Sequence, residues 1–407
     1  MSRPMKDSYV EWIGFIPTNW NVQRLKFLSS IKTGNKDTID KVDEAEFPFF
    51  VRSPKVERID SYSFDGEAIL TAGDGVGAGK VFHYANGKFN YHQRVYNIHN
   101  FKNINGIFLY YYMKVNFIKE VEKGTAKSTV DSIRLHMLQN FSVCLPPIEE
   151  QQRIVSFLDE KVTHIDSILA DTKESIEALK SYKQSLITET VTKGLDANVE
   201  MKDSGIEWIG LIPTHWNSAL LSQYFKQVKN KNKELIETNL LSLSYGKIIQ
   251  KDINTTDGLL PSNFEGYNII QDNDIVLRMT DLQNDKTSLR VGYSNQDGII
   301  TSAYITVRPY NTIHSHYVYF FLHSFDIYKG FYGMGSGVRQ NVTFEILKKL
   351  EILLPPLNEQ KMIVEYIENK ILVIDELIND KESLIKEIES YKKSFIYEYV
   401  TGKKEVK

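Results

Sequence analysis

MKDSYVEWIGFIPTNWN, at residues 5–21, returns as MKDSGIEWIGLIPTHWN at residues 201–217, with four positions changed. A second motif also occurs twice: LPPIEEQQRIVSFLDEKVTHID starts at Leu145, and LPPLNEQKMIVEYIENKILVID starts at Leu354. The first pair is offset by 201 − 5 = 196 residues and the second by 354 − 145 = 209, while the sequence between the motifs loses its similarity. Such self-similarity indicates an internal repeat. Each half is therefore a shared frame, made of the two motifs, around an insert of its own sequence.

The second motif of each frame predicts a long helix. Two prolines end the preceding segment, and about forty residues without proline follow. Apolar residues recur at two heptad positions, which is the pattern of a coiled-coil seam, and two seams in one chain can pair. The predicted seam residues are Val155, Leu158, Val162, Ile165, Leu169, Ile176, Leu179 and Leu186, then Val364, Ile367, Ile371, Ile374, Ile378, Ile385, Ile388 and Phe395. Lys183 and Lys392 also lie on the seams, where a polar residue can fix the register or admit a partner. We interpret them instead as lysines that reach past the seam to solvent.

Composition is typical of a folded cytoplasmic protein with several domains. The 407 residues are 42% hydrophobic and 12% aromatic, which argues against disorder. The single cysteine, Cys144, excludes an internal disulfide and a multi-cysteine zinc site. We expect no signal peptide and no membrane span.

Charge permits nucleic-acid binding without demonstrating it. The net charge is −3, although residues 22–148 carry 17 basic and 13 acidic groups and residues 218–356 carry 14 and 13. The inserts are thus at +4 and +1, and the negative charge lies in the frames. Such a mild excess is also typical of an ordinary solvated surface.

No catalytic or metal-binding residue is predicted. The loop from Gly73 to Lys80 fails the Walker pattern, because Val81 stands where Ser or Thr is needed for magnesium. It also fails the dinucleotide pattern, because Ala78 replaces the third glycine. Either it is a flexible hairpin loop, or its glycines let the backbone approach a ligand closely. The Asn-Pro-Pro-aromatic and Asp-Pro-Pro-Tyr segments of amino-methylating DNA methyltransferases are absent from the sequence.

Side chains suited to DNA cluster in the inserts. Arg can bind guanine, and Asn and Gln can bind adenine, whereas Lys suits phosphates. For any one residue, a role in a turn is the more common explanation, so the clusters carry the prediction. The predicted DNA-binding residues are Lys80, Lys88, Asn90, Gln93, Arg94, Lys127 and Ser128 in the first insert, and Arg278, Thr280, Gln283, Asn284, Lys286, Arg290, Arg339, Gln340 and Asn341 in the second.

Together these motifs resemble the specificity subunit of type I restriction-modification systems over essentially the whole chain. The resemblance is carried by DSGIEWIGLIPTHW, by the LPPxxEQ start of each helix, by AGDGVGAGKVF with KFNYHQRVY, and by DLQNDKTSLR with GIITSAY. Two glycine-rich stretches, GTAKSTVDSIRL and GSGVRQNVTF, belong to it too. The resemblance implies that each insert is a target recognition domain for one half of a split DNA site.

The predicted fold class is α+β: two α/β target recognition domains separated by an antiparallel coiled coil of two long helices, with a pseudo-twofold internal repeat. The expected segments are a frame motif at 1–21, recognition domain 1 at 22–148, a spacer helix at 149–195, a linker with the repeated motif at 196–217, recognition domain 2 at 218–356, and a second spacer helix at 357–402.

The resemblance also implies partners. We expect double-stranded DNA, two methylation subunits and, in the full complex, restriction subunits; S-adenosylmethionine, ATP and magnesium would be bound by those partners, with no cofactor on this chain. Two other classes stay open as alternatives: a coiled-coil scaffold for protein interactions, and an autonomous DNA methyltransferase, which would need the catalytic segment that the sequence lacks.

Overall fold

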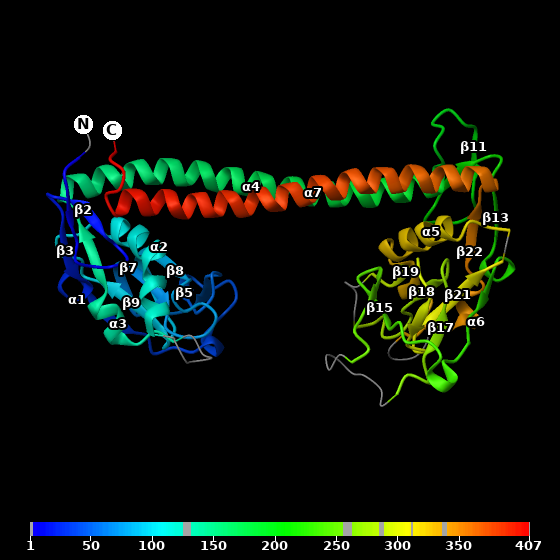
Figure 1. The fold of residues 1–407 in the computed structure, drawn as a ribbon, viewed down its shortest axis with the longest axis horizontal. Coiled ribbons are helices and arrows are strands. Elements are labelled where there is room, and N and C mark those ends of the chain that lie inside the picture. The colour runs from blue at the N-terminus through cyan, green and yellow to red at the C-terminus, as the bar shows by residue number, and fades with distance from the viewer. Residues whose placement is uncertain are drawn as a thin grey trace. The chain divides into compact units, whose positions relative to one another are not determined.

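The computed structural model describes residues 3–124, 132–254, 263–284, 289–310, 312–335 and 340–406. The chain divides into two compact units: unit 1 is residues 1–173 with 382–407, and unit 2 is residues 174–381. Each unit holds one insert and a part of both long helices (Figure 1). Within the described residues, no helix combines the length and apolar character needed to cross a lipid bilayer.

Unit 1 is built on a six-stranded sheet in the order β4-β9-β7-β8-β5-β6. All of its neighbours are antiparallel except β5 and β8, which are parallel. Its elements up to the first long helix are β1 (Met5–Asp7), β2 (Phe15–Pro17), β3 (Asn21–Arg24), α1 (Leu25–Leu28), β4 (Ser30–Thr33), η1 (Thr38–Asp40), β5 (Phe47–Phe50), β6 (Glu57–Ile59), β7 (Phe64–Ala72), β8 (Phe82–Tyr91), β9 (Val95–His99), α2 (Gly106–Gly124), α3 (Leu135–Asn140) and β10 (Ser142–Leu145).

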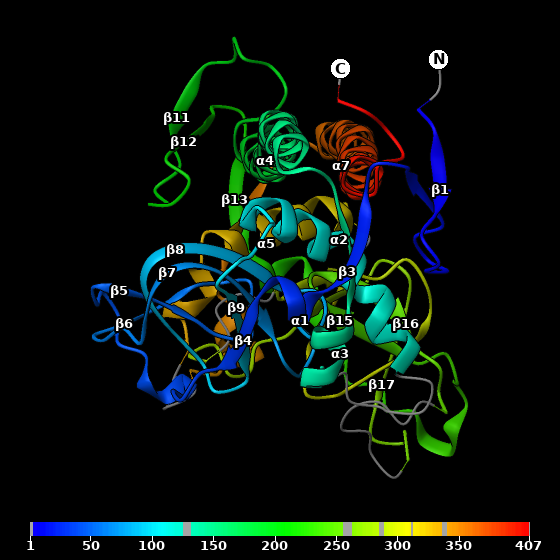
Figure 2. The same ribbon diagram turned by 90° about the vertical axis from the view of Figure 1, so that its left-hand side faces the viewer.

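Helix α2 covers this sheet on the side of the long helices (Figures 1 and 2). Its Phe108 and Tyr112 are fully buried in the same core as Ile69 of β7 and Ile98 of β9. Burying an aromatic side chain of this size stabilises a fold by about 1.5–3 kcal/mol, so α2 fixes the sheet to the rest of the unit. Helix α2 contains the apolar run GIFLYYYMKVNFI.

Unit 2 repeats the core of unit 1 with shorter strands. Its four-stranded sheet has the order β14-β21-β18-β19, which corresponds to β4-β9-β7-β8, and α5 takes the place of α2. Its elements are β11 (Met201–Asp203), β12 (Leu211–Pro213), β13 (Asn217–Leu220), η2 (Leu221–Gln223), β14 (Phe225–Gln227), η3 (Lys233–Leu235), β15 (Leu241–Ser244), β16 (Lys247–Gln250), β17 (Asn268–Ile270), β18 (Ile275–Leu277), β19 (Val291–Tyr293), β20 (Gly298–Ile300), β21 (Ile305–Pro309), α5 (Ser315–Ile327), η4 (Gly330–Gly333), α6 (Phe344–Leu347) and β22 (Glu351–Leu354).

The two frames fold identically in register. Met5 pairs with Pro17 in the β1/β2 hairpin as Met201 pairs with Pro213 in β11/β12. The strand that leaves the first motif then pairs with the strand that enters the second, β3 with β10 and β13 with β22. The two repeated motifs are therefore partners in space, which explains why both recur together around unrelated inserts.

The frames meet the inserts through the glutamine of LPPxxEQ. Gln151 is fully buried; its amide accepts from the backbone N–H of Asn105, just before α2, and donates to the carbonyl of Pro146. Gln360 makes the corresponding bonds to His314 N–H, just before α5, and to the carbonyl of Pro355. Each glutamine thus joins an insert to its long helix.

The long helices α4 (Ile148–Lys193) and α7 (Leu357–Val400) begin directly after the LPP prolines. Within unit 1 they run antiparallel: the ring of Phe157 contacts that of Tyr399, at 4.8 Å between centroids, while Asp166 further along α4 pairs with Lys392. In unit 2, Lys183 pairs with Asp375. The predicted fold class, two α/β domains with an antiparallel pair of long helices, is confirmed.

Burial along both helices follows the heptad pattern. The predicted seam residues of α4 from Val155 to Leu169 expose 9% of their surface or less, and Ile176 and Leu186 are buried too. On α7, Val364, Ile367 and Ile374 are buried, and the remaining predicted seam residues (Leu179 of α4, with Ile371, Ile378, Ile385, Ile388 and Phe395 of α7) are half-buried.

Our interpretation of the two seam lysines is wrong. Instead of reaching solvent, Lys183 Nζ donates to both carboxylate oxygens of Asp375, at 2.7 and 2.8 Å, and Lys392 Nζ donates to Asp166. The pairs are related by the repeat, since 166 + 209 = 375 and 183 + 209 = 392. Each unit therefore holds one copy of the same bridge between its two helices.

Candidate nucleic-acid interface

The glycine-rich loop of unit 1 is the meeting point of three segments quoted from the sequence. Gly73 N–H donates to the carbonyl of Arg94 at 2.8 Å, and Ile133 N–H donates to the carbonyl of Gly73 at 2.7 Å. A Cβ at Gly73 would lie 2.9 Å from that Arg94 oxygen, so only glycine permits this approach. The structure thus brings together AGDGVGAGK, YHQRV and the residues Ser132 to Arg134 of GTAKSTVDSIRL at one surface.

Arg94 lies on this surface with a 60% exposed side chain. Its guanidinium donates to Asp74 in the glycine-rich loop, and Arg52 donates to the other oxygen of that carboxylate at 2.8 Å. Partial burial opposes ionisation of Asp74, but the two arginines outweigh it and lower its pKa. Arg94 is therefore an exposed cation held in position, which is what a base-reading arginine needs.

Gln93 lies next to Arg94 and is also exposed. Its amide donates to Asp37 at 2.6 Å, and its backbone N–H donates to the carbonyl of Lys36. The carboxylate of Asp37 also caps the short helix η1 by accepting from Thr38 N–H. Gln93 is thus held by Asp37, and Arg94 is held by Asp74, which it shares with Arg52. No motif in the sequence marks Asp37 or Arg52.

The prediction for Asn90 is wrong. Its side chain is 1% exposed, and its oxygen accepts from Ser63 Oγ at 2.7 Å and from Tyr91 N–H at 3.0 Å. Its amide nitrogen donates to the carbonyl of Ser61. Asn90 satisfies buried backbone and hydroxyl groups, so it is not placed to face a base.

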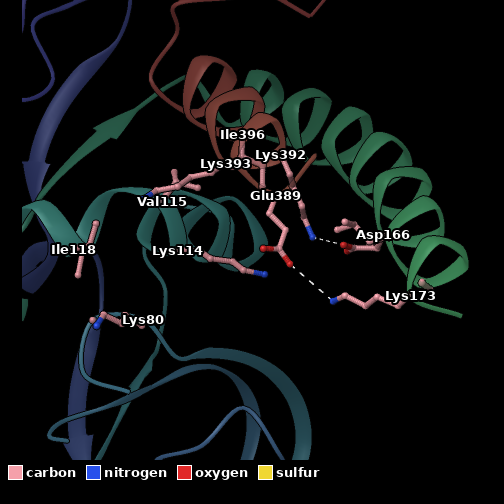
Figure 3. A pocket seen from close by; sticks show the side chains of 13 residues that line it. Lys80, Lys114, Val115, Ile118, Asp166, Lys173, Glu389, Lys392, Lys393 and Ile396 are labelled. Atoms are coloured by element: carbon pink, nitrogen blue, oxygen red, sulfur yellow. Dashed lines mark hydrogen bonds and ion pairs between the residues drawn. The ribbon is translucent and has the colours of Figure 1, made fainter. Parts of the chain in front are cut away.

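The two lysines of this group lie at other places on unit 1. Lys88 is exposed on β8, with its ammonium 4.8 Å from the ring of Tyr62. Lys80 lines a cavity beside the long helices (Figure 3). Lys127 and Ser128 lie outside the described residues.

In unit 2, the corresponding surface joins the RMTDLQN loop to the end of the glycine-rich stretch GSGVRQNVTF. Val342 N–H donates to the carbonyl of Met279 at 3.0 Å, and the side chain of Asn341 accepts from Asp281 N–H at 2.8 Å. Asn284 donates to the Asp281 carboxylate at 2.8 Å. The amide groups of Asn284 and Asn341 thus converge on Asp281, and both side chains are exposed.

The other predicted residues of unit 2 differ in how far their side chains are exposed. Gln283 is exposed, while Arg278 and Thr280 are half-buried. Gln340 adopts a left-handed backbone, with φ of 47°, beside Gly335, where a Cβ would lie 2.5 Å from the Gln340 carbonyl oxygen. Lys286 and Arg339 lie outside the described residues.

The prediction for Arg290 is wrong as well. Its side chain is fully buried, and its guanidinium donates to the backbone carbonyls of Arg278, Thr280 and Asp281 at 3.1, 2.9 and 3.3 Å. Arg290 therefore shapes the RMTDLQN loop from within and does not face a ligand. The sequence motif does not reveal whether an arginine is buried against carbonyl groups or exposed to a ligand.

Comparisons with known proteins identify the frame and insert pattern. The family model of the type I restriction modification DNA specificity domain matches residues 17–178 and 215–387. The specificity subunit of the type I restriction enzyme EcoDI of Escherichia coli is 33% identical over 175 residues, which is 43% of this chain and 38% of that subunit. The putative MjaX specificity subunit of Methanocaldococcus jannaschii is 27% identical over 407 residues, covering 90% of this chain and 89% of that one.

The MjaVIII specificity subunit of the same archaeon is 25% identical, over 65% of this chain and 64% of that subunit. The chain thus spans less than two thirds of the length of two of these three relatives. Among solved structures, a chain from work on the assembly and conformational transition of the type I restriction-modification system has a TM-score of 0.65 at 13% identity, covering 95% of this chain and 98% of that one. At this identity, the likeness shows the fold alone.

Proposed function

The chain belongs to the family of type I restriction-modification DNA specificity domains, and from this premise we propose that it reads a split, asymmetric site in double-stranded DNA, one insert for each half-site. Its relatives are specificity subunits, which implies a non-catalytic role. The inserts are accordingly named recognition domain 1 (residues 22–148) and recognition domain 2 (residues 218–356).

The observation that carries this proposal is one scaffold with two different surfaces. Both domains present a loop that follows the central strand, β7 or β18, and hold it against a second polar segment. Domain 1 places Arg94 and Gln93 there, whereas domain 2 places Asn284 and Asn341. An arginine fits guanine and an asparagine fits adenine, so different side chains on equivalent loops support two different half-sites.

The repeated frames support docking of two methylation subunits, one for each frame. Each frame exposes an apolar residue at the same motif position, Phe15 at 61% and Leu211 at 55%. Each pair of helices exposes a tyrosine at the same repeat position, Tyr391 at 58% and Tyr182 at 56%. Exposed apolar residues at equivalent positions of the two halves suit two copies of one partner. S-adenosylmethionine, ATP and magnesium would be bound by the methylation and restriction subunits of that complex.

Methylome sequencing tests the proposal. The chain is expressed with its methylation subunits in a host without other methyltransferases, and methylated sites are aligned. We expect a single motif with two short, unlike half-sites separated by unspecified bases. A continuous motif, or no methylation dependent on this chain, would contradict the proposal, and failure of the complex to bind duplex DNA would favour the protein scaffold.

A further inference from the structure

A cavity of about 650 Å³ lies within unit 1, between recognition domain 1 and the long helices. Three parts of the unit form its walls: the end of the glycine-rich loop, the middle of α2, and the facing stretches of α4 and α7 (Figure 3). The volume is within the range of sites for small ligands, roughly 300–1,000 Å³. The proposed reading of bases on the Arg94 surface does not use this cavity.

Lysines dominate the charged groups that line the cavity. Two of the five lysines form ion pairs across the helix pair, Lys392 with Asp166 and Lys173 with Glu389. Asp166 and Glu389 are the two acids of the lining. The remaining lysines are Lys80, Lys114 and Lys393. In the described part of the chain, none of these three has a carboxylate within ion-pair distance.

Local contacts fix the positions of Lys114 and of the loop that carries Lys80. Lys114 Nζ donates to the hydroxyl of Tyr110, one turn earlier on α2, at 3.2 Å, and lies 5.3 Å from that ring, which orients the ammonium without cancelling its charge. Gly79, with φ of 70°, presses the loop onto α2, where a Cβ would lie 2.9 Å from Val121. Gly79 and its neighbour Lys80 both line the cavity at this contact.

The rest of the lining is apolar, with Val115 and Ile118 on α2 facing Leu169 and Ile396 on the long helices. Because Lys80, Lys114 and Lys393 are exposed, salt should weaken their attraction for an anion. The second half of the repeat lacks lysines at two of the three equivalent positions. At the positions 209 residues away, His323 stands for Lys114 and Gln184 for Lys393.

We propose that this cavity is a phosphate-binding site, present once per chain, in which Lys80, Lys114 and Lys393 hold one or more phosphate groups. Phosphate fits because lysine binds it as a point charge from several directions, whereas a planar carboxylate is better matched by arginine. The phosphate has two possible sources: the backbone of DNA bound to recognition domain 1, which rests on the proposed function, or a small oligophosphate.

The test compares two triple variants that each lose three positive charges from unit 1. The site variant is K80Q/K114Q/K393Q, and the control is K55Q/K102Q/K386Q, whose lysines are exposed and do not line the cavity. Because all six lysines lie at the surface of the unit, both variants should keep the thermal midpoint of the wild-type chain, which calorimetry checks.

Two measurements distinguish the sources of phosphate. Inorganic triphosphate is titrated calorimetrically into the full chain, and the salt dependence of DNA binding is measured for the complex with methylation subunits. If the source is a small oligophosphate, the site variant binds triphosphate at least about tenfold more weakly than the wild type, while the control does not. If the source is DNA, the slope of log K against log [salt] becomes shallower by about 0.9 for each phosphate that the variant no longer neutralises, for any DNA sequence.

A site variant that matches the control in both measurements overturns the inference. A wild-type complex that binds no DNA is a different result: it refutes the proposed function, and the triphosphate titration then decides the inference alone.

Discussion

Arg94 is the residue on which the reading of half-site 1 depends most directly. Replacing it with alanine should weaken binding to DNA with the correct first half-site by about 1–3 kcal/mol, because alanine cannot donate the paired hydrogen bonds that arginine makes to guanine. Binding measured against DNA altered in either half-site checks this. The matched control is Lys55→Ala, which removes an exposed charge from the same domain. Equal weakening of discrimination at both half-sites would contradict the assignment.

Gln151 carries a prediction about stability. Gln151→Ala leaves the N–H of Asn105 and the carbonyl of Pro146 buried without their partner, which should lower the free energy of unfolding by about 1–3 kcal/mol. Chemical denaturation measures the change. The neighbouring Gln152 is exposed on the same helix, so Gln152→Ala should leave stability within about 0.5 kcal/mol of the wild type. Similar losses of stability for both variants would show that the amide is not the cause.

For single residues, the sequence predicted which segments are polar better than it predicted which side chains are exposed. Arg94 and Asn341 are where polar loops were expected, but Asn90 and Arg290 are buried. Asn90 lies between two buried aromatics because the end of β8 is covered on both faces, which alternation of polar and apolar residues does not reveal. The acids that hold Arg94 and Gln93 come from distant segments, and only the fold brings them together.

The two ion pairs between α4 and α7, Lys183 with Asp375 and Lys392 with Asp166, lead to a prediction about the stability of the helix pair. Both are partly exposed, so each should contribute about 0.2–1 kcal/mol of coupling. Lys392→Asp should destabilise the helix pair, and Lys392→Asp with Asp166→Lys should recover part of the stability. A double-mutant cycle measured by denaturation gives the coupling, with Lys386→Asp on the exposed face of α7 as control. No recovery in the double variant would mean that the bridge does not set the register.

The elements differ in how far the sequence predicts them. The long helices were predicted because prolines mark their starts and the heptad pattern persists along their length. The shared strand order of the inserts was not, because strands such as β18, only three residues long, are too short for a periodic signal. Their common architecture comes from packing against α2 or α5, which the inserts share, and not from similar sequence.

For the whole molecule, the long helices should determine the spacing between half-sites. Deleting one heptad from each, residues 172–178 of α4 and 380–386 of α7, keeps both seams in phase. The deleted segments lie between the ion-pair residues of each helix, Asp166 and Lys183 or Asp375 and Lys392, so both bridges are retained. At 1.5 Å per residue, the deletion shortens each helix by about 10 Å.

The methylated target should contract by at most about three base pairs, at 3.4 Å for each, while the half-site bases stay the same. A two-residue deletion from each helix is the control, because two residues are about 200° of helical turn, so the seam beyond the deletion faces away from its partner, which should abolish assembly, not respace the target. Methylome sequencing of hosts that carry each variant measures both properties. Retained methylation at the original spacing would show that the helices do not set the distance, whereas changed half-site bases would mean that they take part in reading the sequence.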